Sequence, residues 1–394
     1  EIYTYYDSAR LLTLRRVADK LLAVFQVGRS ISDIKVLRFS ADADGNVVYI
    51  DNRGEPDHTF PEAHDFEWIR PTSADHILGR HPHISILDEV FVETVGGDLT
   101  IKVEDNTEDG EGIYREDVDD PNQSLDDADI AYAKRGNLIL LSIKPYGEDQ
   151  TRFLVFNTQT RAVHRVDGIG QSCQTPPEDH GILFPGGYLL RTGELKVFDP
   201  DARGMVFERM VRSPNGEDVL YVFHRHEDGL YLLCPYNLIR KEVVNPLTAH
   251  GWSLFRDGTL VVFKASDTPS RVHPLQIWKT SFVSDEFHAA QPEGEGLLGR
   301  VGNRDLVRGI SDAYTLVNLA TREQVTRQTF EELVAAANRF NDAYYWAGEA
   351  EVGDLRGRVI TLRDTAELII DEFEKVQVLQ RRAKEVLREA KKAQ

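Results

Sequence analysis

The sequence predicts a mainly β fold, in which antiparallel hairpins repeat as in a β-propeller, with an N-terminal helix and a C-terminal helical, coiled-coil segment. Three observations support this fold class: turn residues separate short apolar runs over most of the chain, two long stretches look like copies of one unit, and a heptad pattern runs to the last residue. We therefore expect three parts, at 1–33, 34–328 and 329–394.

Residues 8–26 are expected to form the N-terminal helix, with Asp7 or Ser8 as its cap. Apolar side chains recur in this segment at helical intervals, as on one face of an amphipathic helix. They are Leu11, Leu14, Ala18, Leu21, Leu22 and Phe25.

From about Ile34 the pattern changes to strands joined by turns. "KVLRFSADADGNVVYIDN" (36–52) and "EVFVETVGGDLTIKVED" (89–105) each read as strand, glycine-containing turn and strand, and such strands are expected to continue to about residue 325.

Two stretches look like repeats of one four-stranded unit. Residues 137–168 are followed by 180–199, and residues 218–245 by 250–265. Each copy has a long hairpin, a loop, a His-Gly pair (His180-Gly181 or His250-Gly251) and a second hairpin. This arrangement is typical of propeller blades, and a pair of β-sandwiches is the alternative.

Helix is expected again at the end of the chain. Thr329 and Glu332 form a capping-box pattern, and after a break at 348–357 no Gly or Pro follows. A heptad stripe then predicts a coiled coil, with a helix docked on its own domain as the alternative. The stripe comprises Leu362, Ala366, Ile369, Phe373, Val376, Gln380, Ala383, Leu387 and Ala390. Because the chain begins without Met and ends within a heptad, we expect it to be a piece of a longer protein.

The composition is that of a globular protein, with 41% hydrophobic, 9% aromatic and 28% charged residues among 394. No apolar run approaches the roughly 20 residues that a bilayer requires, and no secretory leader is present, so membrane contact is not expected. Cys173 and Cys234 are too few for a disulfide framework, which favours a reducing cytoplasm. The net charge of −19 disfavours nucleic-acid binding by the surface as a whole.

The usual nucleotide and hydrolase motifs are missing from the sequence. A phosphate-binding P-loop requires Gly-Lys, a dipeptide that does not occur here, and "GIGQS" (168–172) fits a turn better than a phosphate loop. Neither G-x-S-x-G nor H-E-x-x-H is found. We therefore expect no catalytic residue and no cofactor in this chain.

Two histidine pairs, His81/His83 and His224/His226, are the strongest metal candidates, because side chains two apart on a strand share a face. The downstream glutamate of a cupin metal site is replaced by Leu87 and Asp88 after the first pair, and by Leu230 and Tyr231 after the second. A third ligand would have to come from His180, His250 or His273. We interpret both pairs as polar side chains where a strand reaches solvent, without metal.

An acidic stretch at 104–129 holds 12 Asp and Glu among 26 residues. Asp105, Thr107, Asp109, Gly110 and Glu116 match the spacing of a calcium loop, but a strand precedes them rather than a helix. A solvated acidic loop is the expected outcome.

The end of the last predicted helix is basic, with a net charge of +5 from Lys375 to Gln394. We expect the solvated flank of a coiled coil, and contact with nucleic acid is the alternative. The charged residues are Lys375, Arg381, Arg382, Lys384, Arg388, Lys391 and Lys392, against Glu385 and Glu389.

Several long motifs in a fixed order carry a family resemblance. They include "ILGRHPHISILDEVFVETVGGDLTIKVEDNTEDGEGIYREDV", "QSLDDADI", "FLVFNTQTRAVHRVDGIGQSCQ", "EDHGILFPGGYLLRTGE", "VRSPNGEDVLYVFHR" and "PYNLIRKEVVNPLTAHGWSLF". From about residue 34 to the C-terminal helix, the chain resembles the region that precedes the AAA+ module in large bacterial proteins described as DNA repair ATPases. The resemblance implies an uncharacterised domain, then a coiled coil, then the ATPase. The family's nucleotide-binding residues match no position here.

We expect a non-catalytic interaction module of a larger AAA+ ATPase, which recognises a protein partner and is coupled to its own ATPase module by a helical stalk. Oligomerisation through the C-terminal helix is a further possibility. Two functions of other classes remain open: a metal-dependent hydrolase with its site at the propeller mouth, and a nucleic-acid clamp that uses the basic terminal helix.

Overall fold

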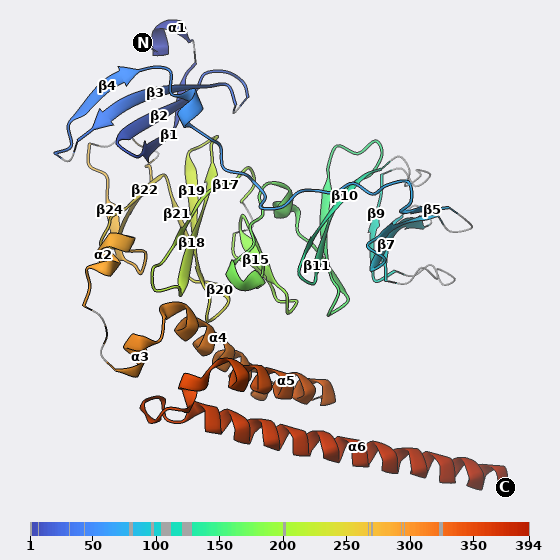
Figure 1. Ribbon diagram of the computed structural model, residues 1–394. Coiled ribbons are helices and arrows are strands. Elements are labelled where there is room, and N and C mark those ends of the chain that lie inside the picture. Colours follow the sequence, from blue (N-terminus) through green and yellow to red (C-terminus); the bar gives the residue numbers. More distant parts are fainter. Residues whose placement is uncertain are drawn as a thin grey trace.

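The computed structural model describes residues 2–6, 8–30, 32–42, 44–78, 82–95, 98–103, 112–119, 128–199, 202–266, 268, 271–292, 294, 296–322 and 326–393. It confirms a mainly β fold with helices at the C-terminal end (Figure 1). The strands form six antiparallel sheets among these residues. None of the helices described there is both long enough and apolar enough to cross a membrane.

The N-terminal sheet follows a four-residue helix, α1 (Ile2–Tyr5), and its strands are hydrogen-bonded in sequence order. They are β1 (Arg10–Val17), β2 (Lys20–Gln26), β3 (Ile34–Ala41) and β4 (Val47–Asp51).

Five further sheets, here called sheets 1 to 5, follow one another along the chain. Sheet 1 contains β5 (His76–Ile77), β6 (His83–Ile86), β7 (Val90–Val95), β8 (Asp98–Lys102) and β9 (Tyr114–Asp117). Sheet 2 contains β10 (Asp129–Arg135), β11 (Leu138–Lys144), β12 (Arg152–Asn157) and β13 (Ala162–Arg165). Sheet 3 contains β14 (Gly181–Phe184), β15 (Gly187–Leu190) and β16 (Leu195–Val197). Sheet 4 contains β17 (Val206–Arg212), β18 (Asp218–Arg225), β19 (Leu230–Asn237), β20 (Glu242–Val243) and β21 (Leu247–Ala249). Sheet 5 contains β22 (Gly251–Leu254), β23 (Thr259–Phe263) and β24 (Leu275–Lys279).

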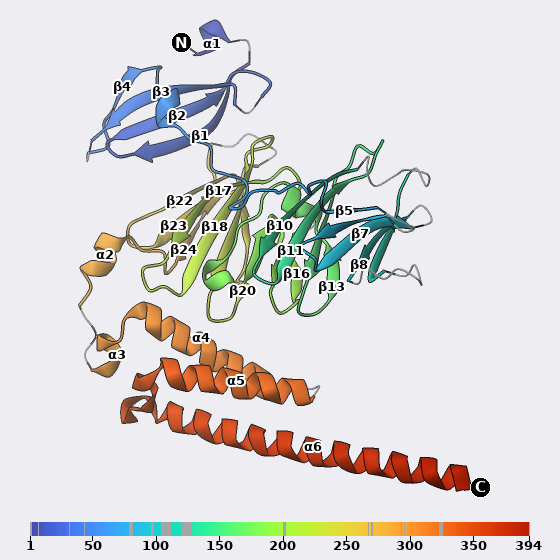
Figure 2. The ribbon, with the colours of Figure 1, turned by 45° about the vertical axis from the view of Figure 1, so that its right-hand side comes forward.

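Each of these sheets shares an apolar core with the next one. Ile86 of sheet 1 packs in one cluster with Leu141 of sheet 2, and Tyr188 of sheet 3 packs with Phe223 of sheet 4. Two further clusters join sheet 2 to sheet 3 and sheet 4 to sheet 5. Face-to-face stacking of this kind is how propeller blades pack. Among the described residues no core cluster joins sheet 1 to sheet 5, so a closed ring is not established (Figure 2).

The helix predicted over residues 8–26 is wrong, because this segment forms the β1–β2 hairpin. Ala18 and Asp19 make the turn, and Ala18 has the positive φ of 54° that such a turn requires. Leu, Arg, Ala and Lys favour helices, so the local sequence pointed to the wrong structure. Pairing of β2 with both β1 and β3 buries Leu22 and Val24 completely, and this tertiary burial outweighs the propensity.

The repeated unit predicted from the His-Gly pairs spans two sheets rather than one. Its first hairpin lies in sheet 2 or sheet 4, and its second hairpin opens sheet 3 or sheet 5. Gly181 and Gly251 each begin the second hairpin. A Cβ at Gly181 would lie 2.1 Å from the carbonyl oxygen of Leu189, and one at Gly251 would lie 2.0 Å from the Phe263 ring. The glycine of the pair is therefore required by close approach of the neighbouring strand.

Strands end earlier than predicted, because helices already begin at residue 285. They are α2 (Asp285–Ala289), α3 (Leu297–Arg300), α4 (Asn303–Ala320), α5 (Arg327–Ala343) and α6 (Leu355–Ala393). The hydroxyl of Thr326 accepts a hydrogen bond from the backbone N–H of Thr329, so α5 is capped one turn before the predicted Thr329 cap. The long C-terminal helix is confirmed as α6, and a shared core that includes Leu316, Phe340 and Ala366 holds α4, α5 and α6 together.

Candidate functional site

His224 and His226 lie at the end of the β18–β19 hairpin, as predicted, but His224 does not reach solvent. Its side chain is only 3% exposed, since its ring stacks on Tyr231 of β19, with centroids 4.0 Å apart and planes 6° apart. The cross-strand register places His224 directly opposite Tyr231. The ring of His226, just beyond β18, meets that of His224 edge-on at 4.3 Å. The prediction of a solvent-facing pair is therefore wrong for His224.

Buried polar atoms without a hydrogen-bond partner occur on this hairpin and on the adjacent strand β17. Nδ1 of His224, Nδ1 of His226 and Oε2 of Glu208 are buried and have no hydrogen-bond partner among the described residues. A bulge in β17 sets Glu208 out of the ladder, and the guanidinium of Arg209 lies 4.2 Å from the centre of the Trp252 ring. Glu208 and Arg209 lie on the strand that pairs with β18, and Trp252 belongs to the core shared by sheets 4 and 5.

Burial and positive charge lower the pKa of both histidines. Burial is the main reason that the pKa of His224 falls to about 3, and the neighbouring His226 and Arg10 of β1 lower it further. Burial and Arg10 also lower the pKa of His226. Burial raises the pKa of Glu208, while the charge of Arg209 opposes that shift.

This environment predicts a loss of stability in mild acid. The folded-state pKa of His224 is depressed, so the unfolded chain binds a proton below about pH 6.5 that the folded chain does not bind. The free energy of unfolding is expected to fall by roughly 2 kcal/mol between pH 6.5 and pH 5 from this one group. Chemical denaturation across this range checks the value. In His224→Phe the free energy of unfolding should fall less steeply with decreasing pH, whereas His273→Phe, at an exposed position, should leave the pH dependence unchanged. The same pH dependence in both variants would contradict a role for His224.

The residues expected as further metal ligands do not gather around this pair. His180 shares a hydrogen bond of 3.1 Å with the Tyr236 hydroxyl, Nδ1 of His250 accepts one from the Ala265 backbone N–H, and His273 is exposed. Within the part of the chain that the structure describes, no three His, Cys, Asp or Glu side chains lie close enough to hold a metal ion. The expected absence of a metal stays a prediction.

The first histidine pair and the acidic loop lie partly outside the described residues. His81 is among the residues not described, whereas His83 is buried in sheet 1, edge-on to Phe91, so the prediction of a solvent-facing side chain is wrong for His83 as well. Asp105, Thr107, Asp109 and Gly110 also lie outside the described ranges. Glu116 is described, and its carboxylate pairs with Arg152 at 3.2 Å and Arg165 at 3.1 Å. That carboxylate is engaged by two guanidinium groups.

The helix α4 joins the stacked sheets to the helical segment. On its sheet-facing side, Arg308 donates to both oxygens of Glu178, at 2.8 and 2.7 Å, and the Ser311 hydroxyl donates to the Leu238 carbonyl at 3.3 Å. Val307 packs on the core between sheets 3 and 4.

The opposite side of α4 packs on the other helices. Leu316 is buried with α5 and α6, and Asp312 accepts a hydrogen bond of 2.7 Å from the Tyr344 hydroxyl. A Cβ at Gly309 would lie 2.6 Å from the Trp346 ring, so this approach requires glycine. The sequence patterns predicted strands up to about residue 325, so α4 was not expected.

Among the side chains of α6 that the structure describes, those of the first half pack against the rest of the chain. Phe330 of α5 contacts Phe373, and Arg327 pairs with Glu374 at 2.6 Å, where α5 begins. The side chains that follow, from Lys375 to Val386, are exposed, and the helix continues alone (Figure 1).

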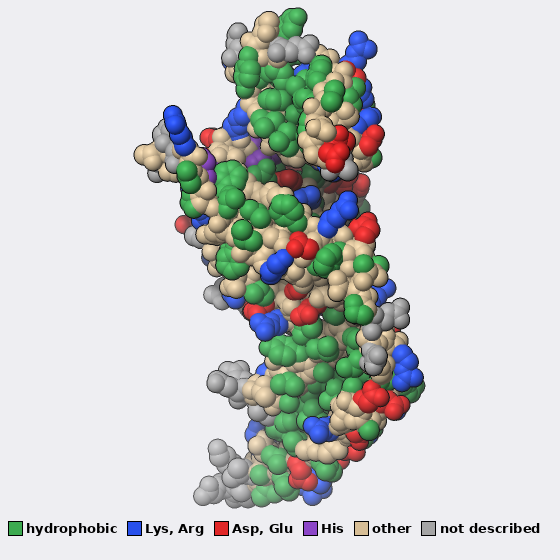
Figure 3. Space-filling model, turned by 90° about the vertical axis from the view of Figure 1, so that its left-hand side faces the viewer, with side chains coloured by type: hydrophobic (Ala, Val, Ile, Leu, Met, Phe, Trp, Pro, Cys, Tyr) green, Lys and Arg blue, Asp and Glu red, His purple; other side chains and the backbone are tan. Residues whose placement is uncertain are grey.

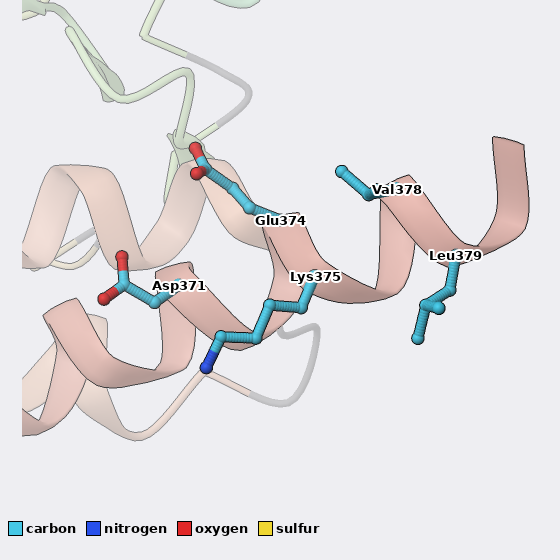
Figure 4. Close-up of a pocket in the computed structure, with 5 residues that line it drawn as sticks. All are labelled: Asp371, Glu374, Lys375, Val378 and Leu379. Carbon is cyan, nitrogen blue, oxygen red and sulfur yellow. The ribbon is translucent and has the colours of Figure 1, made fainter. Parts of the chain in front are cut away.

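An open hollow lies on α6 at this point. It is lined by Asp371, Glu374, Lys375, Val378 and Leu379 (Figure 4). These lining side chains project from α6 alone, so the hollow is part of a helix surface rather than an enclosed ligand pocket.

The outer face of sheet 5 is apolar and uncovered. Leu260 and Val262 face sheet 4, so the alternate residues Val261 and Phe263 face outward, opposite Ile277 and Leu275. Phe263 is 37% exposed, Leu275 58% and Ile277 67%. Figure 3 shows hydrophobic side chains gathered on this side of the molecule. An apolar patch of this kind is typical of a surface that binds another protein.

A family model described as "ATPase involved in DNA repair" matches residues 1–345. The match confirms the resemblance found in the sequence and extends it to residues 1–33, which the quoted motifs did not include. The search among curated proteins found no match.

Three solved structures are similar to the chain at a low level. An oligogalacturonate lyase in complex with manganese has 9% identity and a TM-score of 0.19 over 69% of this chain and 82% of that one. Prolyl oligopeptidase B from Galerina marginata has 8% identity and a TM-score of 0.19 over 68% of this chain and 42% of that one. The S. cerevisiae core factor has 10% identity and a TM-score of 0.22 over 87% of this chain and 60% of that one. Such low scores support neither a common fold nor a function.

Proposed function

This chain belongs to the family described as "ATPase involved in DNA repair", and we propose on that premise that it is a non-catalytic recognition module of a larger ATPase. Its stacked sheets, which we take to be propeller-like blades, bind a protein partner. The helix α6 then acts as a stalk that passes the binding event to the ATPase module of the parent protein.

The observation that carries the proposal is the double contact of α4. Arg308 and Ser311 fasten it to sheets 3 and 4, while Leu316 lies in the core with α5 and α6. A displacement at the sheets is therefore transmitted to the base of α6 through packed side chains. The exposed apolar face of sheet 5 provides a surface for the partner.

Nothing in the described residues favours the alternative of a metal-dependent hydrolase. His224 and His226 are engaged with aromatic rings, and no third ligand lies beside them in the described ranges. Elemental analysis of the purified chain is expected to find no stoichiometric metal, and a bound metal ion retained through gel filtration would reopen that alternative.

Two measurements test the proposed function. The purified 394-residue chain is expected to hydrolyse no ATP above the buffer rate, and hydrolysis that co-purifies with the chain would contradict the proposal. Affinity purification of the full-length parent is expected to recover a protein that Ile277→Glu loses. The matched control is Val197→Glu, at an exposed position on β16 of sheet 3, which should retain that protein. Equal recovery with both variants would contradict recognition by sheet 5.

A further inference from the structure

The part of α6 that follows Glu374, here called its free half, carries an uncovered apolar stripe over residues 375–386. Val376, Leu379, Ala383 and Val386 follow one another at intervals of three, four and three residues, and therefore lie on one side of the helix. Val376 is 49% exposed, Leu379 63% and Val386 64%. Solvated residues on an isolated helix would not need this spacing, which is that of a helix-packing seam.

The stripe continues a seam that is occupied in the first half of α6. There Ala366 is buried in the core shared with α5, and Phe373 contacts Phe330 of α5. The α5 helix begins at Arg327, beside Glu374, and so covers α6 no further. A helix in the line of α5 would cover the stripe from Val376 onward.

The charges beside the stripe indicate the charge of a helix that could pack against it. Arg382 is three residues after Leu379 and four before Val386, so it borders the stripe. Lys375, four residues before Leu379, also borders it but is paired with Glu372 of the same helix at 2.6 Å. Arg381, Lys384 and Arg388 make the rest of this half basic, against Glu385, which lies on the opposite side, seven residues after Val378, and Glu389, seven residues after Arg382. In the covered half the signs are reversed, since Glu374 of α6 pairs with Arg327 of α5.

We propose that the free half of α6 binds an acidic amphipathic helix, whose apolar face covers Val376, Leu379 and Val386 and whose carboxylates pair with Arg382. A second copy of this chain does not fit as the occupant, because two free halves side by side would bring basic flanks together. Nucleic acid would use the basic residues but would leave the apolar stripe exposed to water. The proposal rests on the proposed role of α6 as a stalk and names the chemistry of its partner.

The test uses two synthetic helices about three heptads long, with Leu at positions a and d. One has Glu at positions e and g, and the other has Lys there. Fluorescence anisotropy at about 150 mM salt, where weak surface charge effects are screened, measures their binding to the 394-residue chain. The Glu peptide is expected to bind and the Lys peptide to bind at least about tenfold more weakly, which corresponds to about 1.4 kcal/mol.

Variants at exposed positions distinguish the contribution of the apolar stripe to peptide binding from that of the charged side chains. Leu379→Ser and Val386→Ser should each weaken the Glu peptide about tenfold, whereas Val378→Ser, at a position 47% exposed but off the stripe, should not. Arg382→Glu should weaken the Glu peptide and strengthen the Lys peptide.

Four results would overturn the proposal: no binding of either peptide, equal binding of both, dimerisation of the chain that Leu379→Ser abolishes, or retention of duplex DNA that Leu379→Ser leaves intact. The peptide assay does not involve sheet 5. Its failure therefore remains distinguishable from a failure of the Ile277→Glu purification, which tests the proposed function.

Discussion

Lys102→Met is expected to lower the free energy of unfolding by about 3–5 kcal/mol, because it leaves the Glu93 carboxylate buried without its partner. Lys102 donates to Glu93 across β7 and β8, and the two side chains are only 5% and 3% exposed. The second carboxylate oxygen, Oε2 of Glu93, has no hydrogen-bond partner in the described structure. Urea denaturation followed by circular dichroism measures the loss.

The double variant Glu93→Gln/Lys102→Met separates the lost pair from the stranded charge. It removes both charges at once, so most of the stability should return. If the single and double variants lose the same free energy, the cost comes from packing at Lys102, and this account of the pair is wrong.

Phe223→Ala is expected to cost a similar amount, about 3–5 kcal/mol, through the cavity that it leaves between sheets 3 and 4. Phe223 is fully buried, and its ring meets that of Phe207 edge-on with centroids 6.1 Å apart. The same denaturation experiment applies. Phe255→Ala, at a position 54% exposed, is the control and should change the stability little. Comparable losses in the two variants would contradict the shared core.

The hairpins could be predicted from sequence wherever glycine marks the turn. Asp228-Gly229 is such a case, since Gly229 has a φ of 73° and joins β18 to β19. The β1–β2 hairpin could not be predicted in this way, because Ala18 supplies its turn and the surrounding residues favour helix. A hairpin with glycine in its turn, such as β18–β19, is therefore visible in the sequence, whereas one with alanine there, such as β1–β2, is not.

The helix α4 was missed for a related reason. Gly309 interrupts its helical pattern and resembles a turn signal, whereas its actual role is to admit the ring of Trp346. Trp346 lies 37 residues further along the chain, beyond α5, and a local pattern does not reveal that contact.

The environment of the histidine pair was also hidden from the sequence. The spacing of His224 and His226 placed them on one hairpin end, which the structure confirms. Their burial depends on Tyr231 across the strand pair, and their pKa depends on Arg10, which lies in β1 more than 200 residues earlier. Strand periodicity gives the face of a side chain but not what covers that face.

Pulsed EPR distance measurement tests most directly whether α4 holds α6 in a fixed position relative to the sheets. Spin labels at Glu227→Cys in the β18–β19 turn and Gln377→Cys on α6 occupy exposed positions, whereas the native Cys173 and Cys234 are fully buried and remain unlabelled. One narrow distance distribution is expected. Ser311→Arg, which forces a large charged side chain into the contact with Leu238, should broaden it, and Asn318→Arg on the exposed side of α4 should not. A broad distribution in the unmodified background, or one that Ser311→Arg leaves unchanged, would contradict this role of α4.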